Sequence, residues 1–521
     1  MTAALHKKFG NHVPDILDCL EQLSNDEVPT PPRIAREMLN LLPPGVWSNP
    51  DYKWLDPFSK SGVFLRESAA RLLDGLAGWE PDFEKRRDHI YRNMLYGNAI
   101  TTMTGMIARR SLYCSRDASS DLSVVKLDSP DGNLPFIGAE HVGTGANCDI
   151  CGGPFSLERE GRENYAHAFI HGAYPTEEMT DMKFDVILGN PPYHLETDGN
   201  TRTRSIYPLF VEKAIAMDPQ YVLMITPSRW FAGGLGMDGF RARMLNDEQL
   251  EHIVDYPQSK DCFSGPKIRG GVSYFLWTKG HSGGCSVRTG RGHEVGPPMV
   301  RKLSDYDVFV RFNEGVGIIE KVRSKKELTM DGRVSSLRPF GIWAKFRDYV
   351  PQGTPAAITL HIMGRKTQWA KPEVVTASKE LIPKWKTLLH RAYGEDHDGP
   401  YSVIANPFIA APSSACTDTY LVVGSFDTEA EAANLAAFLR TKFARFLIWL
   451  RMNTQDIRKD VFSFVPDLDW KKFWTDETLY ARYGLTDDEI DVIEYQIRPM
   501  ATPGANDPVE DPAENLAEDV E

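Results

Sequence analysis

Short apolar segments alternate with helical patterns through the first half of the chain. Short, mainly apolar segments predict buried strands at residues 52–58, 93–100, 184–190, 221–227 and 271–279. Apolar positions at helical spacing predict helices at residues 62–73, 101–112 and 207–217. This alternation predicts an α/β domain with a mostly parallel sheet from about residue 28 to residue 300.

The rest of the sequence departs from that pattern. Residues 113–174 interrupt it with Cys, Gly and Pro, so we expect an insertion there. Residues 301–500 mix strand and helix signals and predict a second, α+β domain, in which residues 428–450 form the strongest helix. Residues 1–27 are expected to be an N-terminal extension, and residues 503–521 an acidic, disordered tail.

Composition and charge fit a soluble protein with a nucleic-acid partner. The 521 residues allow two or three domains, and no run of eighteen apolar residues or signal peptide appears. Seven cysteines in such a chain favour a reducing cytoplasm over a disulfide framework. Net charge is −13, yet residues 321–391 hold fifteen Lys or Arg against five acids, which is a workable footprint for DNA.

The segment Gly189-Asn190-Pro191-Pro192-Tyr193 follows the apolar run at residues 186–188. Two prolines lack amide donors and stiffen the chain, so it leaves the sheet as an extended turn. The turn presents the Asn190 amide, the Pro191 carbonyl and the Tyr193 ring at the carboxyl end of a strand, where ligands bind in open α/β sheets.

A second turn, DPFSKSGVFL at residues 56–65, ends the first predicted strand. Its small residues Ser59, Ser61 and Gly62 let the backbone approach a ligand, with a helix N-terminus close behind. It matches neither the G-x-x-x-x-G-K-[ST] phosphate loop nor the G-x-G-x-x-G dinucleotide pattern, so alone it is a weak signal.

Together and in this order, the two turns resemble those of the N6-adenine DNA methyltransferases of restriction-modification and phage-defence systems, in the subgroup whose cofactor motif comes first. VPTPPRIAREML upstream and KFDVILGNPPY add to the resemblance. It implies a Rossmann-like class I fold that binds S-adenosylmethionine. The implied cofactor contacts are Thr30, Asp56, Pro57, Phe58, Ser61, Gly62, Asn98 and Asn190, and the implied catalytic residues are Asn190, Pro191, Pro192 and Tyr193.

Two positions depart from the family pattern. Lys60 stands where the family has glycine, and we expect its long side chain to point outward. Ala99 stands where an acid usually bonds the cofactor ribose, so Asn98 or a backbone group is expected to make that contact.

The implied methyl transfer to adenine explains the residue types of the Gly189–Tyr193 turn. An adenine amino nitrogen is a poor nucleophile because its lone pair is delocalised into the ring. Acceptors on Asn190 and Pro191 can hold its two hydrogens, which localises the lone pair and aims it at the methyl donor. Tyr193 would stack on the base after it is flipped out of the duplex.

The insertion carries a candidate structural zinc site. Cys148 and Cys151 have C-x2-C spacing, and His167 and His171 follow fifteen residues later with H-x3-H spacing. Cys114 borders the same insertion. Which four of the five bind stays open, since His171 could instead line the adenine pocket and leave the other four as ligands.

The basic second domain is expected to recognise the DNA target. Arg365, Lys366 and Trp369 are the candidate DNA-binding residues within its interleaved basic and aromatic segments. A nuclease or helicase could be separately encoded. The alternatives are a catalytically silent DNA-binding subunit and a protein-glutamine or RNA methyltransferase; the recognition sequence, oligomeric state and biological role stay open.

Overall fold

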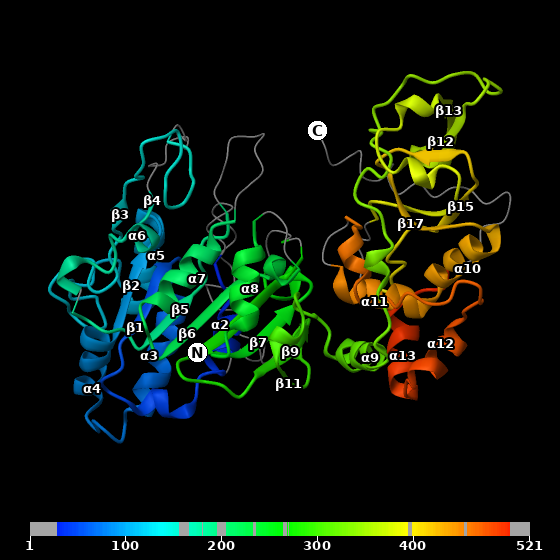
Figure 1. The fold of residues 1–521 in the computed structure, drawn as a ribbon. Coiled ribbons are helices and arrows are strands. Elements are labelled where there is room, and N and C mark those ends of the chain that lie inside the picture. The colour runs from blue at the N-terminus through cyan, green and yellow to red at the C-terminus, as the bar shows by residue number, and fades with distance from the viewer. Residues whose placement is uncertain are drawn as a thin grey trace, which may run out of the picture. The chain divides into compact units, whose positions relative to one another are not determined.

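The computed structural model describes residues 29–155, 166–179, 181–194, 205–232, 236–263, 268, 270–393, 399–452 and 456–500. The chain divides into two compact units, residues 1–309 and 310–521, which are treated separately below (Figure 1). The predicted extension at residues 1–27 and the predicted tail at residues 503–521 lie outside the described residues.

A nine-stranded sheet forms the centre of the first unit, in the order β10-β9-β7-β8-β6-β5-β1-β2, with β11 also paired to β9. The pairs among β2, β1, β5 and β6 are parallel, whereas β8 runs antiparallel to both of its neighbours. The strands are β1 Trp54–Ser59, β2 Leu95–Ala99, β5 Val186–Gly189, β6 Tyr221–Pro227, β7 Leu250–Tyr256, β8 Val272–Thr278, β9 Cys285–Arg291, β10 Glu294–Val295 and β11 Met299–Arg301. The parallel-dominated α/β architecture expected from the sequence is confirmed.

Helices cover both faces of this sheet because alternate strand residues point to opposite sides. One apolar core joins alternate residues of the sheet, such as Trp54 and Leu188, to helices α2, α3 and α5. The opposite core joins Leu55 and Ile187 to α6, α7 and α8. The helices are α2 Pro32–Leu39, α3 Val63–Gly75, α4 Phe83–His89, α5 Thr102–Tyr113, α6 Ala168–His171, α7 Tyr207–Ala216 and α8 Asp238–Asn246.

The insertion runs along the outer edge of β2. Backbone amides of Gly97 and Ala99 donate to the carbonyls of Asn133 and Pro135 at 2.9 Å each. Farther along, β3 (Gly138–Ala139) pairs with β4 (Ala166–His167), just before α6. The segment thus extends the sheet edge before it reaches the predicted cysteine site.

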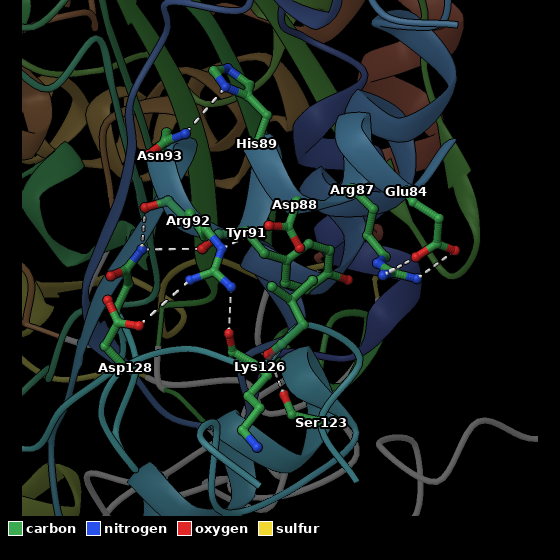
Figure 2. A network of polar contacts seen from close by, with 12 residues as sticks. Glu84, Arg87, Asp88, His89, Tyr91, Arg92, Asn93, Ser123, Lys126 and Asp128 are labelled. Atoms are coloured by element: carbon green, nitrogen blue, oxygen red, sulfur yellow. Dashed lines mark hydrogen bonds and ion pairs between the residues drawn. The ribbon is translucent and has the colours of Figure 1, made fainter. Parts of the chain in front are cut away.

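Arg92, in the π-helical turn Ile90–Met94 after α4, anchors the start of the insertion. Its guanidinium donates to Asp88 Oδ2 at 2.8 Å and to the carbonyl of Lys126, and it lies 4.0 Å from Asp128 (Figure 2). Asn133 donates to the carbonyls of Tyr91 and Arg92 at 3.1 and 2.9 Å. These contacts tie the insertion to the body of the first unit.

The second unit holds two three-stranded sheets around one apolar core. Their orders are β13-β12-β16 and β15-β14-β17. The strands are β12 Ile358–Ile362, β13 Lys366–Ala370, β14 Trp385–His390, β15 Phe408–Ala410, β16 Ser414–Cys416 and β17 Tyr420–Phe426. The helices are α9 Asn313–Ser324, α10 Glu429–Arg440, α11 Lys442–Arg451, α12 Asp476–Tyr483 and α13 Asp487–Gln496.

Two details differ from the expectations. The long helix predicted at residues 428–450 is divided into α10 and α11, because Thr441 adopts a non-helical conformation and its side chain accepts from the amide of Ala444. The units divide after Phe309 rather than near residue 300, since β11 still pairs with β9 and Phe309 stacks on Phe231 at 4.1 Å. Among the described residues, no helix is long and apolar enough to cross a membrane.

Candidate active site

The two motif turns lie side by side because β1 and β5 are adjacent parallel strands. Trp54 pairs with Val186 and Leu55 with Ile187, so Asp56 and Asn190 follow at the same carboxyl edge. Gly189 makes this approach possible: a Cβ there would lie 2.6 Å from Phe58 Cε2 and 2.7 Å from Asp56 Oδ1. Its φ of 143° is also a conformation that side-chain-bearing residues rarely adopt. The structure therefore brings the two predicted motifs into one site.

Thr30, two residues before α2, also lies at this edge and contacts Asn190. The Asn190 side-chain amide donates to Thr30 Oγ1 at 3.1 Å, and both residues are buried. Because the Asn190 side-chain nitrogen is bonded to Thr30, its side-chain oxygen must point away from Thr30. Thr30, predicted only as a cofactor contact, thus also fixes the orientation of the predicted catalytic amide.

The predicted cofactor-binding turn at residues 56–65, called the cofactor turn below, carries a buried acid that suits a ligand with a cationic group. Asp56 is buried, and its Oδ1 has no hydrogen-bond partner among the described residues. Burial raises the pKa of Asp56 to about 7, although Ser59, the Phe58 backbone and the Lys60 charge lower it. Gly62, which precedes α3, has a φ of 72°, and a Cβ there would lie 2.7 Å from the Ala108 carbonyl oxygen, so only glycine lets α5 pack this close to the turn. A buried acid fits a cationic group such as the amino or sulfonium group of S-adenosylmethionine, whereas the helix N-terminus behind the turn fits its carboxylate.

Lys60 does not point outward as expected from the sequence. It is only 9% exposed, and its Nζ lies 5.7 Å from the centroid of the Tyr193 ring. Tyr193 is buried as well and meets Tyr207 edge-on at 6.5 Å. Burial raises the pKa of the Tyr193 hydroxyl well above its usual value. Lys60 therefore belongs to the site and not to the surface.

The side chain of Asn98 holds the insertion in place. Its Nδ2 donates to the Ile137 carbonyl at 3.2 Å, and its Oδ1 accepts from the Ile137 amide at 2.8 Å. Ala99, at the position of the missing acid, is buried. A contact from Asn98 to the cofactor ribose stays a prediction.

The structure gathers three of the five predicted metal ligands and adds a fourth. Cys148, Cys151 and His171 lie with His141 so that one ligand atom of each is within 4.8 Å of all the others. Burial raises the pKa of Cys148, but hydrogen bonds from the Cys151 backbone and from His171 outweigh it and lower that pKa to about 5.

The other two predicted ligands are not part of this group. Cys114 is exposed at the end of α5, and the His167 ring packs against Phe210 at 5.4 Å. Sequence reasoning missed His141 because only histidines after the cysteine pair were considered. The signal available was its position seven residues before Cys148.

The three DNA-binding candidates differ in exposure. Lys366 is exposed at the start of β13, and Trp369 is half-buried. The side chain of Arg365 is used internally: it donates to the Asn406 carbonyl and lies 5.3 Å from the centre of the Phe408 ring. Of these three residues, Lys366 alone is exposed.

The fold and site define an α/β protein in which the cofactor turn and the Asn-Pro-Pro-Tyr turn lie at the carboxyl ends of the adjacent strands β1 and β5. A family model described as the Eco57I restriction-modification methylase matches residues 93–263. A relative from Mycoplasma pneumoniae, described as an uncharacterized adenine-specific methylase, is 35% identical over 306 residues, which cover 53% of this chain and 72% of the relative. The chain belongs to the family of adenine-specific methylases of restriction-modification systems. Methylases of this family use S-adenosylmethionine as methyl donor.

Two solved structures of restriction-modification proteins are similar to this chain at lower sequence identity than the Mycoplasma relative. The type I restriction-modification methyltransferase subunit from Streptococcus thermophilus is 12% identical with a TM-score of 0.33, over 58% of this chain and 54% of that chain. The DrdV–DNA complex is 10% identical with a TM-score of 0.47, over 83% of this chain and 55% of that chain. The chain spans about half the length of both.

Proposed function

We propose that the protein is a site-specific methyltransferase that acts on the N6 amino group of a flipped adenine in duplex DNA. The observation that carries this proposal is the convergence of Thr30, Asp56 and Asn190 at the carboxyl edge of β1 and β5. It places an oriented amide beside a buried acid, within a family of adenine-specific methylases. A restriction-modification or defence role follows from the family.

The residues of this chain would act by orientation and electrostatics. The cofactor supplies an electrophilic methyl group, and Asp56 and the turn through Gly62 would hold its cationic and polar parts. The Asn190 side-chain oxygen and the Pro191 carbonyl would each accept a hydrogen bond from the adenine amino group. That geometry localises the nitrogen lone pair in line for attack on the methyl group. Once the methyl is transferred, the amino group loses one proton to solvent.

Tyr193 would provide the stacking surface for the flipped base. Flipping costs a few kcal/mol of unstacking, which a stacking aromatic ring offsets. In the structure the ring is buried, with Lys60 Nζ 5.7 Å from its centroid and Tyr207 meeting it edge-on.

The second unit would supply target recognition. Val350 donates its amide to the Trp369 carbonyl at 2.8 Å, so the segment before Val350 adjoins the edge of β13. This segment and β13 carry the exposed residues Trp343, Lys345 and Lys366. Lysines suit phosphate contact, and an exposed indole suits contact with a base or sugar.

Transfer of labelled methyl from S-adenosylmethionine to duplex DNA, followed by digestion to nucleosides, tests the proposal. We expect N6-methyladenine as the product, at a limited set of sequences. Methylcytosine as product, or label in protein or RNA but not in DNA, would contradict it. A protein that binds DNA and cofactor without any transfer would establish the silent-subunit alternative.

A further inference from the structure

The insertion and the helix α6 bring together a compact cluster of two thiols and two imidazoles. His141 precedes the knuckle, Cys148 and Cys151 form it, and His171 ends the short helix α6. The amide of Cys148 donates to the Gly153 carbonyl at 2.7 Å, and the amide of Gly153 lies 3.4 Å from Cys151 Sγ. Backbone hydrogen bonds thus shape the loop so that both sulfurs face the same point.

The distances within this group match those around a tetrahedral metal ion. Cys148 Sγ lies 3.4 Å from His171 Nε2, and Cys151 Sγ lies 3.4 Å from His141 Nδ1. Zinc–sulfur bonds of about 2.3 Å and zinc–nitrogen bonds of about 2.0 to 2.1 Å, at a tetrahedral angle, separate a sulfur from a nitrogen by about 3.6 Å. Two thiolates with two imidazoles are a ligand set that selects zinc.

The histidine at the end of α6 is oriented as a metal ligand would be. His171 Nδ1 lies 2.9 Å from the His167 carbonyl oxygen, which fixes the hydrogen on Nδ1 and leaves Nε2 as the free electron pair facing Cys148. A backbone carbonyl on the second ring nitrogen is the usual support for a metal-bound histidine. His167 therefore contributes its backbone to the site and not its ring.

We infer that His141, Cys148, Cys151 and His171 bind one structural zinc ion. The ion would clamp the loop around residues 141–151 to α6. That helix carries Phe169, which is buried and meets Phe58 of the cofactor turn edge-on at 6.0 Å. The zinc site would thus hold in place the helix whose Phe169 packs against Phe58 of the cofactor turn.

The metal content of the purified full-length chain tests this inference. Elemental analysis of protein prepared without chelator should show about one zinc per chain, the stoichiometry of a single four-ligand site. His141→Ala and Cys148→Ser should lose it, whereas Cys114→Ser and His167→Gln, matched controls outside the group, should keep it. Asn190→Ala should also keep it, so failure of the zinc site and failure of methyl transfer can be told apart.

A second measurement covers ligand variants that do not fold. Wild-type protein whose zinc is exchanged for cobalt should show the absorption of a tetrahedral site with thiolate-to-cobalt charge transfer. Folded wild-type protein without zinc would overturn the inference. Full zinc content in Cys148→Ser, or zinc loss in Cys114→Ser, would overturn the assigned ligand set, as would a cobalt spectrum without thiolate bands.

Discussion

Thr30→Val isolates the hydrogen bond that orients the side-chain amide of Asn190, the proposed catalytic residue. Valine keeps the volume of threonine but removes the hydroxyl that accepts from Asn190 at 3.1 Å. Loss of a partner for a buried donor costs about 1 to 3 kcal/mol. If that cost falls on the aligned geometry, kcat should drop roughly five- to 150-fold, at about 1.4 kcal/mol per tenfold. Thr30→Ser keeps the hydroxyl and should retain most of the activity.

The assay is methyl transfer to duplex DNA at saturating cofactor, with cofactor affinity measured separately by calorimetry. Positioning of Asn190 predicts a lower kcat in Thr30→Val with a modest change in cofactor affinity. A pure cofactor contact predicts the reverse, a weaker cofactor affinity with kcat restored at saturation. Wild-type kcat in Thr30→Val, or equal losses in Thr30→Ser and Thr30→Val, would refute the assigned role of the hydroxyl.

Three further perturbations test separate parts of the site. Gly189→Ala should destabilise the fold by about 1 to 3 kcal/mol and cut activity, because its Cβ would press on Phe58 and Asp56; an unchanged denaturation midpoint would contradict this. Burial raises the folded-state pKa of Asp56 to about 7, so the unliganded protein should lose stability as pH rises from about 4 through 7. Denaturant titrations across this pH range should show a flatter trend for Asp56→Asn. Lys366→Ala should weaken DNA binding and reduce its salt slope by about one, whereas Lys471→Ala, exposed in the same unit, should not; equal effects would argue against β13 as a DNA contact.

The local pattern of apolar residues was enough to predict the strands that position the site. The predicted segments coincide with β1, β2, β5, β6 and β8 to within a few residues, because each of these strands is buried and mainly apolar. The strand β7 was missed, since Glu251, His252 and Asp255 interrupt its apolar run. The carboxylate of Asp255 is buried in the fold and accepts from Ser228 Oγ at 2.8 Å, a partner that no local pattern could reveal.

Contacts between distant segments could not be predicted. Thr30 and Asn190 are 160 positions apart, and only the fold shows that they share a hydrogen bond. The prediction that the Lys60 side chain points outward was wrong for the same reason. Its Nζ lies 5.7 Å from the ring centroid of Tyr193, a residue that follows a different strand. Cys148 and Cys151 lie in one cluster as expected, and zinc binding stays a prediction; His141 and His171 come together through the pairing of β3 with β4, which the sequence does not reveal.

The central claim, that the Asn190 turn performs methyl transfer, is tested most directly with Asn190→Ala. Single-turnover transfer of labelled methyl to duplex DNA should fall by about a hundred- to a thousand-fold, the usual cost of one positioned transition-state acceptor. Cofactor affinity by calorimetry should change little, because Asp56 and the turn through Gly62 remain intact. Wild-type turnover by Asn190→Ala would contradict the account.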